Sequence, residues 1–76
     1  MTIAAAYEHG DPGRRIHRLR KNADLSQLEL AGKVGMSRPL VAMWEKGECT
    51  PRLTEFQSLA RALSTTPEYL AFGRVG

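Results

Sequence analysis

The sequence of 76 residues has little of the chemistry on which metal sites, disulfide frameworks and membrane spans depend. Its one cysteine, Cys49, cannot form a disulfide within the chain. Its two histidines, His9 and His17, have no cysteine or histidine partner at the spacing of a zinc site. No stretch approaches the roughly 20 apolar residues that a bilayer-spanning helix needs. We therefore expect no metal, no internal disulfide and no membrane contact.

The features of an enzyme and of a secreted protein are also missing. The sequence has no Gly-rich phosphate loop and no nucleophile with a matched base, so we expect no catalytic activity, no cofactor and no small-molecule ligand. The first ten residues, MTIAAAYEHG, have no basic n-region and too short an apolar run for a secretory signal, which predicts a cytoplasmic protein. Because they show no strong periodicity, we interpret residues 1–10 as a flexible arm.

Positive charge is concentrated near the beginning of the chain. The formal net charge is +3, and the basic residues of this segment are Arg14, Arg15, Arg18, Arg20 and Lys21. Such a run is typical either of a solvated helix face or of a surface that binds a polyanion such as nucleic acid. The run by itself leaves both interpretations open.

Five segments combine a helix-start signal with apolar residues at helical spacing. The start signals are Asp11-Pro12, Ser26-x-x-Glu29, Ser37, Thr50-Pro51 and Thr66-Pro67. No segment alternates between apolar and polar residues as a strand does. The predicted helices cover residues 12–22, 27–33, 38–45, 51–63 and 67–72. The sequence therefore predicts one all-α domain over residues 11–73.

The inward-facing positions of these helices define the expected core. Segments 27–33 and 38–45 share an apolar seam, in which Ala31 is small and Gly35 can take the positive φ of a tight turn. Trp44 follows Val41 by three residues, so both side chains share a face and anchor their helix. The full expected core is Ile16, Leu19, Leu30, Ala31, Val34, Met36, Val41, Trp44, Phe56, Leu59, Leu63 and Leu70.

Four linked segments carry a family resemblance: RRIHRLRKNADLSQ, LAGKVGMS, VAMWEKGECTPR and LARALSTTPEYL. Across residues 13–73 the chain resembles the Cro/repressor-type helix-turn-helix proteins, also called the xenobiotic-response-element family. The resemblance implies a compact five-helix, lambda-repressor-like domain whose helices 27–33 and 38–45 form the helix-turn-helix. It also implies double-stranded DNA as the partner.

The chain departs from the family pattern at several positions. Asp24 and Ser64 stand where the family usually has glycine at helix ends, and Leu28 and Leu40 are apolar where it is usually polar. Gly32 lies inside a predicted helix, where glycine costs about 1 kcal/mol relative to alanine. We interpret Gly32 as a point where a DNA strand or another helix approaches closely.

The helix over 38–45 is the expected DNA-reading element. With Val41 and Trp44 turned inward, its outer side carries the candidate base-reading residues Arg38, Pro39, Ala42 and Met43. By resemblance, the position of Arg38 reads bases, and a guanidinium can bond the O6 and N7 of guanine together. The three apolar side chains suit thymine methyl groups, so we expect Arg38 to make the main hydrogen-bonded base contact.

A second group of residues is expected to contact phosphates, which position the protein without reading sequence. The resemblance implies that Gln27 contacts a phosphate and braces Arg38, and that Lys46 and Arg52 hold phosphates beside the reading helix. Arg14 and Lys33 add long-range attraction. The full expected set is Gln27, Ser37, Lys46, Arg52, Arg14 and Lys33.

The resemblance also implies a structural ion pair between Arg20 and Glu45, which would hold the reading helix at a fixed angle. Tyr69 and Phe72 are candidates for a dimer contact, because exposed aromatic residues on a short last helix suit an interface. Two copies about 34 Å apart would reach successive major grooves, which predicts a homodimer on a palindromic site.

Together these features predict a sequence-specific transcriptional regulator, most simply a repressor, with no effector domain attached. A phage or prophage switch, a self-repressing antitoxin and a restriction-modification controller all fit, and a toxin or antirepressor is a conceivable protein partner. The alternative is a protein-interaction module that does not bind DNA. The apolar side chains of Leu28, Leu40, Ala42 and Met43 would suit a protein partner as well as a groove.

Overall fold

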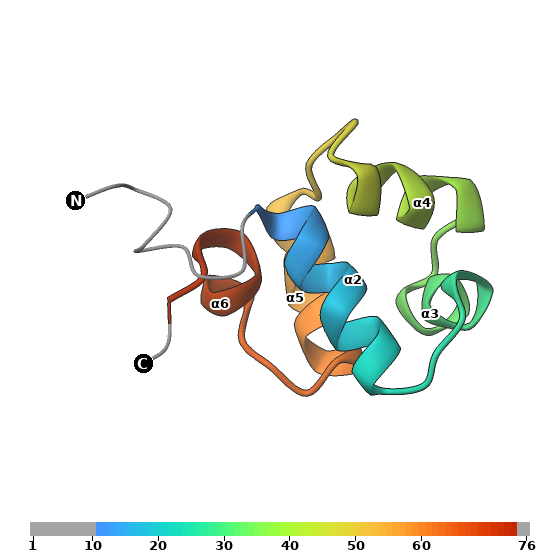
Figure 1. The fold of residues 1–76 in the computed structure, drawn as a ribbon, viewed down its shortest axis with the longest axis horizontal. Helices are drawn as coiled ribbons and strands as arrows, with labels where there is room; N and C mark the ends of the chain where they lie inside the picture. Colours follow the sequence, from blue (N-terminus) through green and yellow to red (C-terminus); the bar gives the residue numbers. More distant parts are fainter. Residues whose placement is uncertain (1–10, 75–76) are drawn as a thin grey trace.

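The computed structural model describes residues 11–74, and within this range the chain forms five helices and no strand (Figure 1). They are α2 (Pro12–Asn22), α3 (Gln27–Val34), α4 (Arg38–Lys46), α5 (Leu53–Ala62) and α6 (Pro67–Phe72). The predicted all-α class is confirmed for these residues. The arm predicted for residues 1–10 lies outside the described residues.

The helices pack so that the two candidate DNA-binding helices share one end of the domain. α2 contacts α4 and α6, α5 contacts α3 and α6, and α3 contacts α4. α3 and α4 lie at one end and α6 at the other (Figure 1). None of the helices within residues 11–74 has both the length and the apolar character that crossing a membrane requires.

The hydrophobic core follows the predicted list except that Met36 is not part of it and Ala60 is an additional member. Its buried members are Ile16, Leu30, Ala31, Val34, Val41, Trp44, Phe56, Leu59, Ala60, Leu63 and Leu70. Leu19 is partly buried and packs against them. The prediction for Met36 is wrong, because this side chain is 37% exposed. Met36 follows Gly35, whose φ of 71° turns the chain between α3 and α4, and it lies at the surface in that turn.

Four helix starts follow the predicted capping pattern. Asp11 accepts a hydrogen bond from the Arg14 amide at 2.9 Å, and Ser37 accepts one from the Leu40 amide at 3.3 Å. Ser26 and Glu29 form the predicted capping box, at 2.9 and 2.8 Å. Thr66 caps α6 through the amide of the residue three positions on. These short-range contacts satisfy amides that have no partner inside the helix.

The predicted start of the fourth helix is wrong by two residues. α5 begins at Leu53, and Arg52 is its N-cap residue with an extended backbone. The Arg52 amide donates to the Glu55 carboxylate at 2.7 Å, and Pro51 is buried in the preceding loop. The Glu55 carboxylate, in the first turn of α5, therefore accepts the hydrogen bond at the start of this helix. Thr50, the start residue predicted from the sequence, lies outside it.

Two turns are closed by residues other than glycine in a left-handed conformation. Asp24 has a φ of 59° after α2, and Ser64 has a φ of 57° after α5. These are the two positions where the sequence departs from the glycine of the family. A residue with a Cβ atom pays roughly 1–2 kcal/mol in this region. Backbone hydrogen bonds close both turns, from the Leu25 amide to the Arg20 carbonyl oxygen at 3.1 Å and from the Thr65 amide to that of Ala60 at 2.9 Å.

Gly13, near the start of α2, lies in tight contact with the backbone of α4. A Cβ atom at this position would lie 2.2 Å from the Trp44 carbonyl oxygen and 3.0 Å from that of Glu45. Only a residue without a side chain lets α2 pack so tightly on the last turn of α4. At Gly32, in contrast, a Cβ atom would meet nothing within 4 Å, so no helix among the described residues approaches it.

Candidate nucleic-acid interface

The inner side of α4 is fixed to the core. Val41 and Trp44 are 0% and 1% exposed, and burial of one such large apolar side chain stabilises a fold by roughly 1.5–3 kcal/mol. Pro39 lies in the first turn, where its missing amide hydrogen is not needed. Gly47 ends the helix in a left-handed conformation, with a φ of 79°. These features orient α4 on the rest of the domain.

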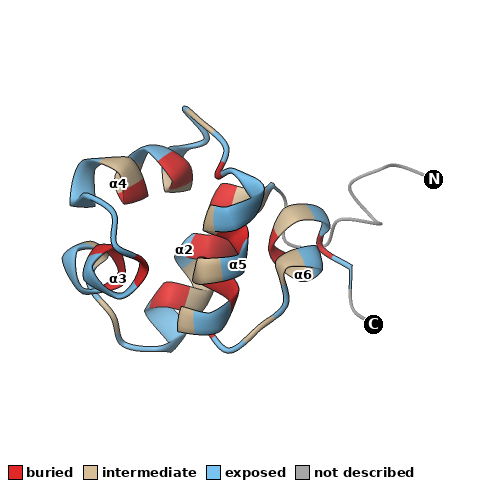
Figure 2. Cartoon of the chain, turned by 180° about the vertical axis from the view of Figure 1, so that it is seen from behind, coloured by how far each residue is buried: buried red, intermediate tan, exposed pale blue. Residues whose placement is uncertain are grey.

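The outer side of α4 is left uncovered by the described residues. Arg38 and Pro39 are exposed, Met43 is 39% exposed, and Ala42 is half-buried. Lys46 is exposed at the end of the helix. The outer sides of α3 and α4 form a largely exposed surface at one end of the molecule (Figure 2). A helix anchored on one side and free on the other can enter a groove.

Behind this helix, Glu45 lies at the centre of a hydrogen-bond network. Arg20 reaches it through Nε at 2.6 Å and through Nη2 at 3.1 Å. The Arg20 and Glu45 side chains are 8% and 5% exposed. Arg20 also donates through Nη1 to the Leu25 carbonyl oxygen at 2.7 Å. The two residues that the resemblance pairs therefore form a buried, two-pronged contact between α2 and α4.

Two further donors complete the coordination of this carboxylate. His17 Nδ1 lies 2.9 Å and Gln27 Nε2 3.1 Å from Glu45 Oε1. Burial acts to raise the pKa of Glu45, but the hydrogen bonds from Arg20, His17 and Gln27 outweigh it, so the pKa lies below its ordinary value of 4.5. The carboxylate is therefore charged at neutral pH.

The network continues from Glu45 to the candidate base-reading residue. Gln27 lies at the start of α3, and its Oε1 accepts a hydrogen bond from Arg38 Nη1 at 3.0 Å. One glutamine side chain therefore contacts both Glu45 and Arg38. This geometry agrees with the bracing role that the resemblance implies for Gln27.

The residues expected at phosphates are spread along the chain. Lys46, Arg52, Arg14 and Lys33 are all exposed, and Gln27 is half-buried. The Ser37 hydroxyl accepts from the Leu40 amide while capping α4. Lys33 borders a hollow of about 290 Å³ that it shares with Ser58 and Arg61 of α5. The structure thus joins Gln27 directly to α4 and places Lys33 beside α5.

The basic run in α2 turns out to be divided between the interior and the surface. Arg15 is 1% exposed, and it donates to the Leu70 carbonyl oxygen at 2.9 Å and to that of Ala71 at 3.1 Å. Arg18 donates to the Tyr69 hydroxyl and lies over the Tyr69 ring. Neither interpretation of the run applies to Arg15, whose contacts lie more than 50 residues away in sequence.

Two further residues of this region, Gly13 and His17, were not predicted from the sequence. Both act through contacts between α2 and α4, which no local pattern encodes. Among residues 11–74 there is no group of three or more histidine, cysteine or acidic side chains that could hold a metal ion. The half-buried Cys49 packs against the core with its thiol free.

Comparison with known sequences shows which family the chain belongs to. A family model described as Helix-turn-helix matches residues 16–70. The chain is 34% identical over 61 residues to Repressor protein C2 of Salmonella phage P22, which is 80% of this chain and 28% of that protein. It is 44% identical over 45 residues to Antitoxin HigA1 of Mycobacterium tuberculosis, covering 59% of this chain and 30% of the antitoxin. HTH-type transcriptional regulator DicA of Escherichia coli is 33% identical over 61 residues, covering 80% and 45%. The chain spans less than half the length of each relative.

Solved structures agree with the sequence relatives. The crystal structure of the P22 c2 repressor with synthetic operator 9T matches with a TM-score of 0.81 and 33% identity, covering 84% of this chain and 97% of that one. The solution structure of the P22 c2 repressor DNA-binding domain matches with a TM-score of 0.81 and 31% identity, covering 90% of both chains. With the family model covering most of the domain, the chain belongs to the helix-turn-helix family of the Cro/C1 type.

Proposed function

We propose that this protein is a sequence-specific, double-stranded DNA-binding transcriptional regulator, most simply a repressor that covers a promoter. The observation that carries the proposal is the free outer side of α4, which is fixed from behind by Val41 and Trp44. The P22 c2 repressor, whose structure this domain matches, was solved with a synthetic operator, which supports the same use of the fold here.

The chemistry of the outer side indicates how it would read a groove. The Arg38 guanidinium lies in the first turn of α4 and can donate to guanine O6 and N7 together, a contact worth about 1–3 kcal/mol of discrimination. Pro39, Ala42 and Met43 offer apolar surface, which suits thymine methyl groups. We therefore propose that base recognition rests on one charged contact and on shape.

Phosphate contacts on either side would set the position of α4 in the groove. The start of α3 offers backbone amides and the positive end of its helix dipole to an anionic oxygen, beside the Gln27 side chain. At the other end of α4, its last residue Lys46 is exposed, and so is Arg52 in the loop that follows. Arg14 and Lys33 would act through longer-range attraction and add to the net positive charge of the chain.

Selection of binding sites from a random duplex pool tests this proposal with the variants Arg38→Ala and Arg52→Ala. We expect the wild type to select one sequence, and Arg38→Ala to lose preference at one base pair while keeping the others. Arg52→Ala is the matched control: it should weaken binding to all sequences alike and lower the salt slope by about 1, because a phosphate contact carries no sequence information.

Two outcomes would count against the proposal. An unchanged base preference in Arg38→Ala would remove Arg38 from base recognition. A wild-type protein without a salt-sensitive complex on any duplex would favour the alternative of a protein-interaction module. Of the apolar residues behind that alternative, Leu28 is 67% exposed, whereas Leu40 packs partly against the core.

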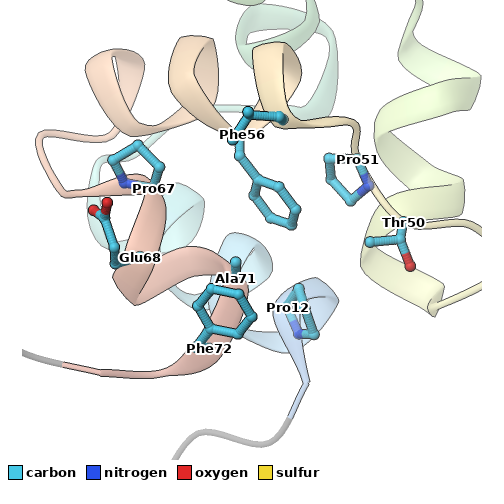
Figure 3. Close-up of a pocket in the computed structure, with 9 residues that line it drawn as sticks. Pro12, Thr50, Pro51, Phe56, Pro67, Glu68, Ala71 and Phe72 are labelled. Atoms are coloured by element: carbon cyan, nitrogen blue, oxygen red, sulfur yellow. The ribbon is translucent and has the colours of Figure 1, made fainter.

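We further propose that two copies bind together, through a surface formed by α6 and the start of α5. An apolar groove of about 330 Å³ lies there, with Pro51, Phe56 and Phe72 among the residues that line it (Figure 3). Phe72 is 55% exposed, and Leu53 at the same groove is 69% exposed. Tyr69, the other candidate, is half-buried and its hydroxyl accepts from Arg18, so we assign the contact to Phe72.

Measurement of the mass of the DNA complex tests this second proposal. We expect two protein chains per selected duplex for the wild type. Phe72→Ser should leave the domain folded but lower the affinity for the full palindrome at least about tenfold, because loss of one buried aromatic anchor costs 1.4 kcal/mol or more. Its affinity for a half-site should not change. A one-to-one complex of the wild type on the palindrome would contradict the proposal.

The sequence relatives indicate the biological settings that suit this chain. The relatives include a phage repressor, an antitoxin and a transcriptional regulator, so a prophage switch and a self-repressing antitoxin with a toxin partner both remain in agreement with them. The family consists of regulators rather than enzymes. We propose that this chain likewise has no catalytic activity and acts on DNA in the cytoplasm.

A further inference from the structure

We propose that Glu45 is a positioning residue for base recognition: it fixes the amide of Gln27, and the amide in turn holds the Arg38 guanidinium in the orientation in which it meets a base. The inference rests on the proposed function, since it concerns how the DNA-reading side chain is held. It gives Glu45 a role beyond its ion pair with Arg20.

The Glu45 carboxylate is held in one orientation by the hydrogen bonds to both of its oxygen atoms. Arg20 contacts both of its oxygen atoms, at 2.6 Å to Oε2 and 3.1 Å to Oε1. The side chain is 5% exposed, so water does not compete freely for these positions. His17 approaches Oε1 from α2 at 2.9 Å. The oxygen atom that faces Gln27 therefore has a fixed position.

This oxygen atom selects one orientation of the Gln27 amide. A charged carboxylate only accepts hydrogen bonds, so the donor Nε2 must face Glu45, which it does at 3.1 Å. The acceptor Oε1 then faces the other way, towards Arg38. A flipped amide would place an oxygen atom against the carboxylate and two N–H groups against a guanidinium, and both contacts would be repulsive.

Arg38 needs the orientation that Glu45 selects. A guanidinium only donates hydrogen bonds, and its Nη1 donates to Gln27 Oε1 at 3.0 Å. This is the single side-chain hydrogen bond of Arg38 within residues 11–74. The remaining N–H groups are enough for the two-pronged contact with guanine. Acceptor and donor groups thus alternate from the buried Glu45 carboxylate, through the Gln27 amide, to the Arg38 guanidinium.

Base discrimination separates this role from a purely structural one. Loss of the Arg20 pair alone would weaken the fold and reduce affinity for every sequence by the same factor. Loss of the positioning role would lower the preference for guanine at the base pair that Arg38 reads, relative to the other three bases at that position. The ratio of affinities, measured well below the melting temperature, is therefore the quantity to follow.

The experiment measures this ratio for the wild type, Glu45→Gln, Arg38→Ala and Glu48→Gln, on the selected duplex and its three substituted forms. Glu48→Gln is the matched control, because it removes one charge from an exposed carboxyl just beyond α4. We expect Glu45→Gln to reduce the discrimination at least about threefold, out of the roughly 5- to 150-fold that a bidentate arginine–guanine contact supplies. Glu48→Gln should leave it unchanged.

A double variant tests whether Glu45 acts on base discrimination through Arg38. In the Arg38→Ala background, Glu45→Gln should cause no further loss of discrimination. Equal discrimination by Glu45→Gln and Glu48→Gln would overturn the inference while leaving the proposed function intact. A wild type without any base preference would overturn the proposed function itself, and this inference with it.

If Glu45→Gln does not fold, a second variant and a second measurement still test the inference. Glu45→Asp keeps the charge for Arg20, but its carboxyl is one methylene shorter and withdraws from Gln27, so it should lose discrimination in the same way. Without DNA, side-chain NMR relaxation should show a more mobile Arg38 guanidinium in either Glu45 variant than in Glu48→Gln. Unchanged Arg38 mobility in both would contradict the inference.

Discussion

Gly13→Ala is expected to destabilise the domain by about 3 kcal/mol, the upper part of the range for inserting atoms into a packed interior. The new Cβ atom would lie 2.2 Å from the Trp44 carbonyl oxygen. The obstacle is backbone rather than the end of a flexible side chain, so α2 would have to move away from α4. That movement would loosen Trp44 and the Arg20–Glu45 contact together.

A loss of stability in Gly13→Ala would distinguish the tight contact from the usual effect of alanine in a helix, which is a gain. Gly13 is in a helix, where alanine is favoured by about 1 kcal/mol when packing plays no part. Gly32→Ala, at a helical position with open space around it, is the control and should stabilise the domain by up to about 1 kcal/mol. Thermal melting should show a drop of roughly 10–25 °C for Gly13→Ala. A Gly13→Ala domain as stable as the wild type would disprove the tight contact.

Glu45→Ala has the second largest expected effect, a loss of about 3 kcal/mol in the free energy of unfolding. Removing one partner of a buried ion pair costs roughly 3–5 kcal/mol, because the other charge is left without a counter-charge. Arg20, whose side chain is 8% exposed, keeps its bond to the Leu25 carbonyl oxygen and a contact of 3.3 Å with His17 Nδ1, so the lower end of the range applies. Denaturant unfolding, with the exposed Glu48→Ala as control, measures the difference.

The same pair predicts how stability depends on pH. The pKa of Glu45 is lowered in the folded protein, so its stabilising contribution is complete above its ordinary value of 4.5 and is lost as the pH falls through the folded-state pKa. The difference in stability between the wild type and Glu45→Ala should therefore shrink below about pH 4.5. A difference that stays constant from neutral pH into this acid range would show that Glu45 is not held in a charged network.

The sequence was most informative where structure depends on neighbouring residues. The start signals at Asp11, Ser26, Ser37 and Thr66 predicted four helix starts, because a capping side chain acts within three residues. The start of the remaining helix, α5, was predicted two residues too early, since the burial of Pro51 depends on residues distant in sequence. Met36 was assigned to the core by its apolar character, although the turn at Gly35 places it at the surface.

The candidate site was predictable only in part, and for a related reason. The spacing of Val41 and Trp44 identified the buried side of α4, which also defined the outer side. The contacts behind it join α2, α3 and α4, and their geometry depends on how the helices cross. The buried role of Arg15 could not be separated from the surrounding basic run, because its carbonyl partners, Leu70 and Ala71, lie in the last turn of α6, about 55 residues away.

We propose that the outer side of α4 is the surface that meets DNA. Mapping backbone amide shifts in isotope-labelled protein during titration with the selected duplex tests it most directly. We predict that the largest changes occur from Ser37 to Met43 and around Gln27 at the start of α3. Large changes confined to α6 and the start of α5, with α4 unaffected, would contradict the account.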